Sequence, residues 1–439
     1  MPDHARSADP AVQRQLDRLS ALGPGADILG LDRITTLLDR LGNPHRALPP
    51  VFHVAGTNGK GSTCAFLRAG LEAAGKRVHV YSSPHLVRFN ERIRLAGSLI
   101  EDEALAPLLE EVLDAGGDIG ASFFEVTTAA AFLAFSRTPA DACVVEVGLG
   151  GRLDATNVLP PPAVAGIAQL GIDHQAFLGN DAETIAAEKA GIAKRGTRLV
   201  TMRYADPIAA RVASVAHAAG ATMLAEGSAW RFSVVGRELR YADARGPLVA
   251  PLPALAGPHQ PANLALAIAM MRFQDPLRIS PDAMVAAGPD ARWPARMQRL
   301  SDGPLSAQAP EAAEIWLDGA HNPAAADVAR DAIWAIAAGR PIHLILGILL
   351  NKDAEDIIWR FSNIAASLTA IPVPGHEHHY PGHLAELGRE MNIPVTEMAD
   401  DVPSALAMLP RTGEPSVVLI LGSLYLAGSV LEANGEIPD

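Results

Sequence analysis

A lysine lies inside a glycine-rich turn early in the chain, in the run Gly56-Thr57-Asn58-Gly59-Lys60-Gly61-Ser62-Thr63. Glycines let the backbone come close to an anion, and the N-terminus of a helix attracts negative charge. Lys60 can bring a positive charge to the β- and γ-phosphates, and Ser62 or Thr63 can add a hydroxyl. The run therefore predicts a phosphate site. The alternative, a tight turn that binds nothing, is disfavoured because the lysine and the hydroxyls follow in register.

The spacing departs from the usual P-loop at one position. In that motif Ser or Thr follows the lysine directly, whereas Gly61 intervenes here. The apolar, β-branched run 51–55 precedes the turn and predicts a buried strand, while the pattern of residues 64–74 predicts a helix. Strand, glycine turn and helix together form the arrangement that a phosphate site needs.

Three further side chains could hold a metal ion, namely Ser83, Glu146 and His174, which lie at or beyond the ends of predicted strands. Ligands gather at the carboxyl ends of strands in open α/β sheets. A hydroxyl and a carboxylate suit Mg²⁺, although imidazole is a less usual ligand for a hard ion. Taken singly, Ser83 would be a turn hydroxyl and His174 a hydrogen-bonded polar residue, whereas Glu146 ends a buried strand and needs a partner. Their joint location favours a metal site.

Two other groups are less specific. Lys189 lies beside Glu188 in a predicted helix, where a solvated surface pair and a functional lysine are equally favoured. The cluster His376-Glu377-His378-His379 has metal-ligand spacing, but it lies between Pro374 and Pro381. Prolines at both sides favour a surface loop over a metal site.

The elements that must position these residues alternate between strand and helix, which predicts an α/β fold with a parallel sheet. Residues 230–241 differ and predict an antiparallel hairpin. Alternation resumes after Pro294, which predicts a second, smaller, doubly wound domain. We place the boundary there, giving domains 1–294 and 295–439.

Composition limits the classes of protein that fit. The chain has 439 residues, of which 49% are hydrophobic and 19% charged, and a formal net charge of −13. These fractions are typical of a globular protein with roughly two or three domains of about 150 residues each. The negative charge argues against a general nucleic-acid surface. We therefore expect small-molecule partners and no nucleic acid.

The cysteines and the N-terminus bear on the compartment. Cys64 and Cys143 are the only cysteines and lie in apolar periodic segments, so we expect buried free thiols in a reducing compartment. The first residues lack the apolar core of a signal peptide, and no apolar run is long enough for a membrane span. We expect a cytoplasmic monomer with no membrane partner.

These motifs resemble the folylpolyglutamate synthase / dihydrofolate synthase family, of the bifunctional bacterial type, which is related to the Mur peptide ligases. The resemblance extends from about Ile28 to Leu426 and includes Gly61, which this family has at that position. It rests on the motifs Gly56–Ser62, Tyr81–Leu86, Glu146–Asn157, Asp173-His174, Glu188–Gly191, Asp318–Pro323 and Gly422–Tyr425.

The resemblance implies a P-loop-containing, Mur ligase-like ATPase domain at 1–294 and a Rossmann-like glutamate-ligase domain at 295–439. It implies that ATP phosphorylates the carboxylate of dihydropteroate, or of a folate that already carries glutamate, and that the amino group of L-glutamate attacks the acyl phosphate. The implied cofactors are ATP and two Mg²⁺ ions, with a carbamylated Lys189 facing the metal.

The resemblance also implies roles for single residues. The residues with catalytic roles would be Lys60, Lys189 and His321. ATP would contact Thr57, Asn58, Gly59, Lys60, Gly61, Ser62, Asn263, Arg296 and Asp318. The metal would be held by Ser83, Glu146 and His174. The pterin and glutamate would contact Ile28, Leu29, Gly30, Ser122, Phe123, Phe124, Glu125, Leu153, Asp154, Ala155, His321 and Ser423.

Some positions depart from the family pattern. The family usually has Pro-Gly-Arg where this chain has Pro294-Ala295-Arg296, and Ala295 restricts the backbone where glycine would not. Gln169 and Gly171 stand where an asparagine is common, and the stretch 350–353 deviates before Lys352-Asp353.

Two other functions remain as alternatives. One is a Mur-type or cyanophycin-type ligase with another acceptor, against which the complete run 146–157 argues. The other is a P-loop NTPase switch that binds a protein partner. A switch would hydrolyse nucleotide without glutamate, whereas a ligase would release phosphate only with both pteroate and glutamate.

Overall fold

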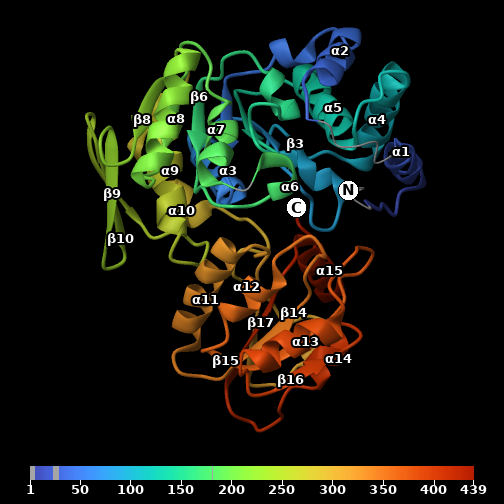
Figure 1. The fold of residues 1–439 in the computed structure, drawn as a ribbon. Helices are drawn as coiled ribbons and strands as arrows, with labels where there is room; N and C mark the ends of the chain where they lie inside the picture. Colours follow the sequence, from blue (N-terminus) through green and yellow to red (C-terminus); the bar gives the residue numbers. More distant parts are fainter. Residues whose placement is uncertain (1–4, 23–28, 180) are drawn as a thin grey trace. The chain divides into compact units, whose positions relative to one another are not determined.

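The computed structural model describes residues 5–22, 29–179 and 181–439 (Figure 1). They form two compact units, each treated by itself below. The first comprises Met1–Ala254, Gln260–Arg292 and Asp439, and the second comprises Leu255–His259 and Trp293–Pro438. The predicted fold class is confirmed, because a parallel-dominated α/β sheet is followed by a smaller α/β sheet. The assignment of an ATP-binding role to 1–294 and a glutamate-ligase role to 295–439 stays a prediction.

The first unit is built on an eight-stranded sheet in the order β4-β3-β2-β5-β1-β6-β7-β8. The strands from β2 to β8 in this order are parallel, whereas β3 is antiparallel to β2 and β4 to β3. The central strands β1 and β5 are buried along their whole length, as their apolar sequences predict. The strands are β1 (Val51–Ala55), β2 (Val78–Tyr81), β3 (Ile93–Leu95), β4 (Ser98–Leu99), β5 (Ala142–Glu146), β6 (Val164–Ile167), β7 (Arg198–Thr201) and β8 (Thr222–Ala225).

Helices connect the parallel strands, because a parallel pair needs a crossover. Side chains of Asp9, Ser122, Asp181 and Ser280 accept hydrogen bonds from backbone N–H groups in the first turns of α1, α5, α7 and α10. The helices of the first unit are α1 (Pro10–Ser20), α2 (Asp32–Arg40), α3 (Lys60–Ala73), α4 (Asp102–Gly116), α5 (Phe123–Arg137), α6 (Gln175–Leu178), α7 (Ala182–Ala190), α8 (Asp206–Ala219), α9 (Gln260–Phe273) and α10 (Pro281–Asp290).

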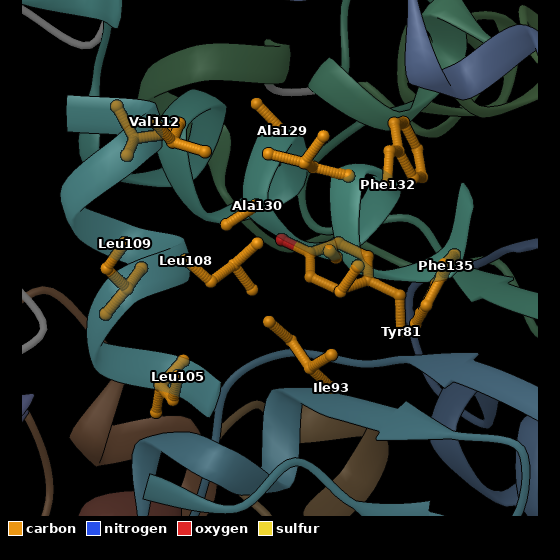
Figure 2. Packing of buried hydrophobic residues seen from close by; sticks show 14 of the residues in the cluster. Tyr81, Ile93, Leu105, Leu108, Leu109, Val112, Ala129, Ala130, Phe132 and Phe135 are labelled. Atoms are coloured by element: carbon orange, nitrogen blue, oxygen red, sulfur yellow. The ribbon is translucent and has the colours of Figure 1, made fainter. Parts of the chain in front are cut away.

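A large apolar cluster covers one face of this sheet, where α1, α2, α4 and α5 pack on strands β1, β2, β3 and β5. Figure 2 shows the ring of Tyr81 among side chains of α4 and α5 and beside Ile93. The Tyr81 hydroxyl is paired with Thr128 Oγ1 over 3.0 Å, so the one polar group of this ring is satisfied. The cluster fixes the ends of β2 and β5, from which Ser83 and Glu146 project.

The region predicted as a hairpin is a three-stranded antiparallel sheet in the order β11-β10-β9. Its strands are β9 (Trp230–Val235), β10 (Glu238–Asp243) and β11 (Gly246–Pro251). Arg272 of α9 donates from Nη1 to Asp243 Oδ1 over 2.8 Å, and both side chains are buried. Its guanidinium also lies over the Tyr241 ring, 5.3 Å from the centroid. The small sheet is therefore held against α9.

The second unit has a six-stranded sheet in the order β12-β13-β17-β14-β15-β16, parallel except for β12. An apolar cluster joins the sheet to α11, α12 and α13. Its elements are β12 (Gln298–Arg299), β13 (Ala313–Leu317), α11 (Pro323–Ala337), β14 (Ile342–Leu346), α12 (Ala354–Trp359), β15 (Ala365–Ala370), α13 (Pro381–Glu390), β16 (Thr396–Met398), α14 (Val402–Ala407), β17 (Ser416–Leu421) and α15 (Leu424–Asn434).

Helix α12 ends at Trp359, shortly before strand β15 begins at Ala365. The proline-rich stretch after Ser280 forms α10. Proline at the first helical position is well tolerated because the N–H that it lacks would have no partner there. Within the described ranges, no helix is both long and apolar enough to cross a bilayer.

Candidate functional site

The glycine-rich turn joins β1 to α3, as the sequence predicted, and α3 begins at Lys60. Gly59 has φ +83°, a region that disfavours side chains with a Cβ. A Cβ at Gly59 would also lie 2.5 Å from Asn263 Oδ1, so glycine is needed for the close approach of α9. Lys60 Nζ donates to the carbonyl oxygens of Gly56 and Thr57 over 3.2 and 3.3 Å. The lysine charge is thus held over the turn, where phosphate oxygens would lie.

The segment after β6 supports this turn from the other side. Thr57 N donates to Gln169 O over 2.8 Å, and Thr57 Oγ1 exchanges hydrogen bonds with the backbone of Gly171. These contacts use only the main chain of residues 169 and 171. The departures from the family pattern at Gln169 and Gly171 therefore leave the support of the turn intact.

The start of α9 makes a second contact with the glycine-rich turn at residues 56–62. Gln260 Nε2 donates to Ser62 Oγ over 3.2 Å, and Asn263 Nδ2 donates to Gln260 Oε1 over 3.1 Å. All three side chains are buried. The structure thus brings the predicted nucleotide residues Ser62 and Asn263 together through Gln260, which the sequence analysis missed. The signal that could have found it was a pair of amides three residues apart at the start of a helix.

Two of the three predicted metal ligands, Ser83 and Glu146, lie at the carboxyl ends of neighbouring strands of the sheet. Glu146 is the last residue of β5, which lies between β2 and β1, and Ser83 follows β2. His174 lies beyond β6 on the other side of β1 and is exposed at the start of α6. No three His, Cys, Asp or Glu side chains gather as a metal cluster among the described residues. The oxygen donors of Ser83 and the buried Glu146 fit a hard divalent ion.

Lys189 is buried, with 3% of its surface exposed, so the solvated surface pair does not occur. Its neighbour Glu188 forms an ion pair with Arg152 instead, with 2.9 Å between Oε1 and Nη2. Burial, helped by the charge of Lys60, lowers the pKa of Lys189 to about 7, against smaller opposing effects of Asp173 and Asp154. A substantial share of the amine is therefore neutral near pH 7.

The residues that resemblance assigned to the pterin site fall into three groups. Ile28 lies outside the described residues, while Leu29 and Gly30 are half-buried. At the start of α5, Ser122 N donates to Glu125 Oε2 over 2.7 Å, and Glu125 N donates to Ser122 Oγ over 3.3 Å. These reciprocal bonds fix the first turn of α5.

Arg33 and Phe124 complete this part of the site. Arg33 Nε donates to Glu125 Oε2 over 2.9 Å, a contact between α2 and α5 that the sequence analysis did not predict. A Cβ at Gly148 would lie 2.3 Å from Phe124 Cζ, so the ring lies directly against the glycine-rich run. Phe123 meets Phe89 edge to face, with 6.2 Å between ring centroids. The half-buried rings of Phe123 and Phe124 thus lie near the buried carboxylate of Glu125.

Asp154 lies in the glycine-rich run after β5, between the half-buried Leu153 and the buried Ala155. Its carboxylate accepts hydrogen bonds from Leu149 N, Thr156 N and Thr156 Oγ1. Burial raises the pKa of Asp154 from its ordinary value, against these hydrogen bonds, which lower it. The Thr156 hydroxyl is also 2.9 Å from Nε2 of His53, a residue of β1 that the sequence analysis did not single out.

In the second unit, Asp318 at the end of β13 accepts hydrogen bonds from Met297 N and Ala320 N over 2.7 and 2.8 Å. Burial raises the pKa of Asp318, while the nearby Arg296 opposes this shift. Arg296 lies between two residues with positive φ, Ala295 at +52° and Met297 at +43°. Ala295 thus has the backbone conformation that glycine, usual in the family, adopts without strain.

His321 and Ser423 have structural partners. Nδ1 of His321 is 2.8 Å from Gly319 O, and the side chain is half-buried. Ser423 is buried and caps α15, where its hydroxyl accepts from Tyr425 N over 3.1 Å. In the loop 376–379, His376 stacks on Tyr425 and His379 Nε2 is 2.9 Å from Lys352 O. Within the described part of the chain, the residues of this loop do not gather as a metal cluster.

Comparisons with known proteins identify a matching family model and similar sequences. Residues 296–424 match the family model of the Mur ligase, glutamate ligase domain. Over 406 residues the chain is 34% identical to the dihydrofolate synthase/folylpolyglutamate synthase of Escherichia coli (strain K12), covering 92% of this chain and 91% of that protein.

Solved structures are similar over nearly their full length. Escherichia coli FolC in complex with DHPP and ADP matches with a TM-score of 0.86 and 32% identity, over 97% of each chain. A bifunctional folylpolyglutamate synthase/dihydrofolate synthase with Mn, AMPPNP and L-glutamate bound matches with a TM-score of 0.83 and 31% identity, over 98% of this chain and 99% of that chain. With this identity over nine-tenths of its length, the chain belongs to the dihydrofolate synthase/folylpolyglutamate synthase family of ATP-dependent ligases.

Proposed function

We propose that this protein joins L-glutamate to the carboxylate of dihydropteroate, and to folates that already carry glutamate, with ATP as the energy source. The order of strands β2, β5, β1 and β6 carries this proposal. It puts Ser83 and Glu146 on the same edge of the sheet as the phosphate turn. The relatives named above, one of which holds a nucleotide analogue, Mn and L-glutamate together, support it.

The reaction needs two transfers. The substrate carboxylate attacks the γ-phosphorus of ATP, which forms an acyl phosphate and releases ADP. The amino group of glutamate then attacks the acyl carbon, the phosphate leaves, and the amine loses a proton. Lys60 and the N–H groups at the start of α3 stabilise negative charge on the transferring phosphoryl group. Gln260 keeps Ser62 and Asn263 in place beside it.

The metal site would use Ser83, Glu146 and His174. Mg²⁺ bound there would neutralise phosphate charge. The chain provides a buried carboxylate at the strand end, and an exposed imidazole that can approach a bound nucleotide from the loop after β6.

Lys189 would carry a carbamate. A neutral amine attacks CO₂, forms an N–C bond and loses a proton, which turns a cation into an anion. The pKa of about 7 supports this step, because burial leaves a neutral amine available near pH 7.

The pterin ring would lie against Phe124 and Ala155, near Leu29, Gly30 and Leu153, with Asp154 as an acceptor for ring N–H groups. In the second unit, Arg296 and Asp318 would contact the nucleotide, and His321 and Ser423 the incoming glutamate. Ser423 already caps α15, so its contribution would come through the first turn of that helix.

We further propose that the protein acts as a cytoplasmic monomer on small molecules, without nucleic-acid or membrane partners. The two buried free cysteines support a reducing compartment.

A phosphate-release assay tests the function. With ATP and L-glutamate present, we expect phosphate release with dihydropteroate and also with tetrahydrofolate. We expect none when no acceptor is added or when glutamate is left out. Absence of glutamate-dependent turnover with both acceptors would overturn the proposal. Hydrolysis of ATP without glutamate would instead support the P-loop NTPase switch.

A further inference from the structure

A histidine occupies the middle of β1, a strand that is otherwise apolar. His53 has no exposed surface, and its strand leads directly into the phosphate turn. Burial, with a smaller effect of Lys194, lowers the pKa of His53 to about 3, so its ring is neutral at physiological pH. A neutral imidazole has one donor and one acceptor nitrogen. The role of His53 therefore depends on which group accepts the hydrogen bond from its protonated ring nitrogen.

The hydrogen bonds around Thr156 determine the tautomer of His53. The Thr156 hydroxyl donates its single proton to Oδ1 of Asp154, because a carboxylate only accepts. The same hydroxyl oxygen, 2.9 Å from His53 Nε2, must then accept the proton on that nitrogen. His53 is therefore protonated at Nε2, and its Nδ1 is buried without a hydrogen-bond partner. These three residues form what we call the buried chain, running from His53 through Thr156 to Asp154.

An unsatisfied Nδ1 has a cost that a purely apolar side chain at position 53 would avoid. The remaining bond of His53 is directed to Thr156, and Thr156 in turn holds Asp154. Asp154 Oδ1 accepts from Thr156 N over 3.0 Å as well, and Oδ2 accepts from Leu149 N over 2.8 Å. A backbone hydrogen bond from Gly148 also stabilises this carboxylate, so Asp154 is held by the main chain of the glycine-rich run as well as by Thr156.

We propose that His53 and Thr156 are positioning residues, which fix the carboxylate of Asp154 so that it accepts a hydrogen bond from the pterin ring. The inference rests on the proposed function, in which Asp154 contacts that ring. It links the strand that bears the phosphate turn to the pterin-binding run, two parts of the site that belong to different segments. Neither His53 nor Thr156 touches the substrate in this account.

The test compares the KM for dihydropteroate with the KM values for ATP and L-glutamate in the full-length enzyme. Thr156→Val removes the hydroxyl at nearly constant volume, and His53→Phe removes the donor while keeping a ring. We expect each to raise the KM for dihydropteroate about tenfold, as the loss of one well-placed hydrogen bond does, with the other two KM values within about twofold. Thr156→Ser keeps the hydroxyl, so its KM for dihydropteroate should be close to that of the wild type.

Two features separate positioning from simple support of the fold. The double variant His53→Phe/Thr156→Val should be no worse than Thr156→Val alone, because residues acting through one chain are not additive. His79→Phe is the matched control, since His79 is also fully buried in a strand of this sheet, and its ring nitrogens pair with Thr138 O and Ala96 N. That control should lose stability and leave the KM for dihydropteroate unchanged.

An unchanged KM for dihydropteroate in Thr156→Val and His53→Phe would overturn the inference, as would an equal rise in all three KM values. Should Thr156→Val not fold, the comparison of His53→Phe with His79→Phe decides in the same way. If the wild type turns over neither dihydropteroate nor tetrahydrofolate, the proposed function fails. If it turns over only tetrahydrofolate, the KM for tetrahydrofolate replaces that for dihydropteroate in these comparisons. If the wild type is active and the variants behave like it, only the role of the buried chain fails.

Discussion

The side-chain amide of Gln260 donates a hydrogen bond to the hydroxyl of Ser62, which joins the first turn of α9 to the first turn of α3. The same side chain accepts a hydrogen bond from Asn263. A glutamine about 200 residues further along the chain thus supports the glycine-rich turn through Ser62.

Replacing Gln260 by Met should weaken ATP binding. The change keeps the volume but leaves Ser62 and Asn263 buried without this partner, which costs about 1–3 kcal/mol per unsatisfied group. We expect the KM for ATP to rise about tenfold, measured by phosphate release at saturating dihydropteroate and glutamate. Gln274→Met, at a buried glutamine near the other end of α9, is the control and should leave that KM unchanged. Equal KM values for ATP in both variants would contradict the role of Gln260.

Glu146→Gln should weaken the metal dependence of the enzyme. The amide keeps the size of the side chain but lacks the negative charge that a hard divalent cation prefers. We expect the Mg²⁺ concentration for half-maximal activity to rise at least about tenfold, and chelation with EDTA to abolish wild-type turnover until Mg²⁺ is restored. A Mg²⁺ titration identical to the wild type would show that Glu146 holds no metal.

Lys189 should respond to CO₂. After exchange into CO₂-free buffer the wild type should lose activity, and bicarbonate should restore it, more fully above pH 7, where the amine is neutral. Lys189→Ala should be inactive with or without bicarbonate, whereas Lys76→Ala, at a lysine near the end of α3 that we place outside the site, should behave like the wild type. Full activity of Lys189→Ala would refute the role of this lysine.

The same residue should make stability depend on pH. The pKa of Lys189 is about 7 in the folded chain against an ordinary value of 10.5. Between these pH values the unfolded chain binds more protons, so this group makes stability rise with pH from about 7 toward 10.5. Lys189→Met should flatten that rise in urea unfolding followed from pH 6.5 to 9.5. A variant with the wild-type slope would mean that the folded amine is not perturbed.

Ala295→Gly should stabilise the protein. A positive φ costs a residue with a Cβ about 1–2 kcal/mol, and the freedom of glycine in the unfolded chain takes back part of this, so we expect a gain of about 0.5–1 kcal/mol. Ala338→Gly is the matched control, because Ala338 has φ +49° at the end of α11. Both variants should gain stability by urea unfolding, and a loss in Ala295→Gly alone would show that Ala295 is unstrained.

Local pattern was enough to predict the glycine-rich turn between β1 and α3 and most of the sheet. The apolar run of β1, the glycines at 56 and 59 and the helix after Lys60 act over neighbouring residues, so spacing alone predicts them. The third strand of the β9–β11 sheet was missed, because β11 contains Gly246, Pro247 and Pro251, residues depleted in strands. It is stabilised by pairing with β10, which no local pattern reports.

The sequence by itself determined the family and the residue types at the edge of the sheet, because these lie in short contiguous motifs. Only the tertiary structure decided that Lys189 is buried rather than paired with Glu188, that Ala295 has a positive φ, and that His53 reaches Asp154 through Thr156. Each of these depends on contacts between residues that are distant in the chain. Packing of those residues also excludes water from the groups that it buries. Burial and hydrogen-bond partners follow from that packing, which no spacing along the chain encodes.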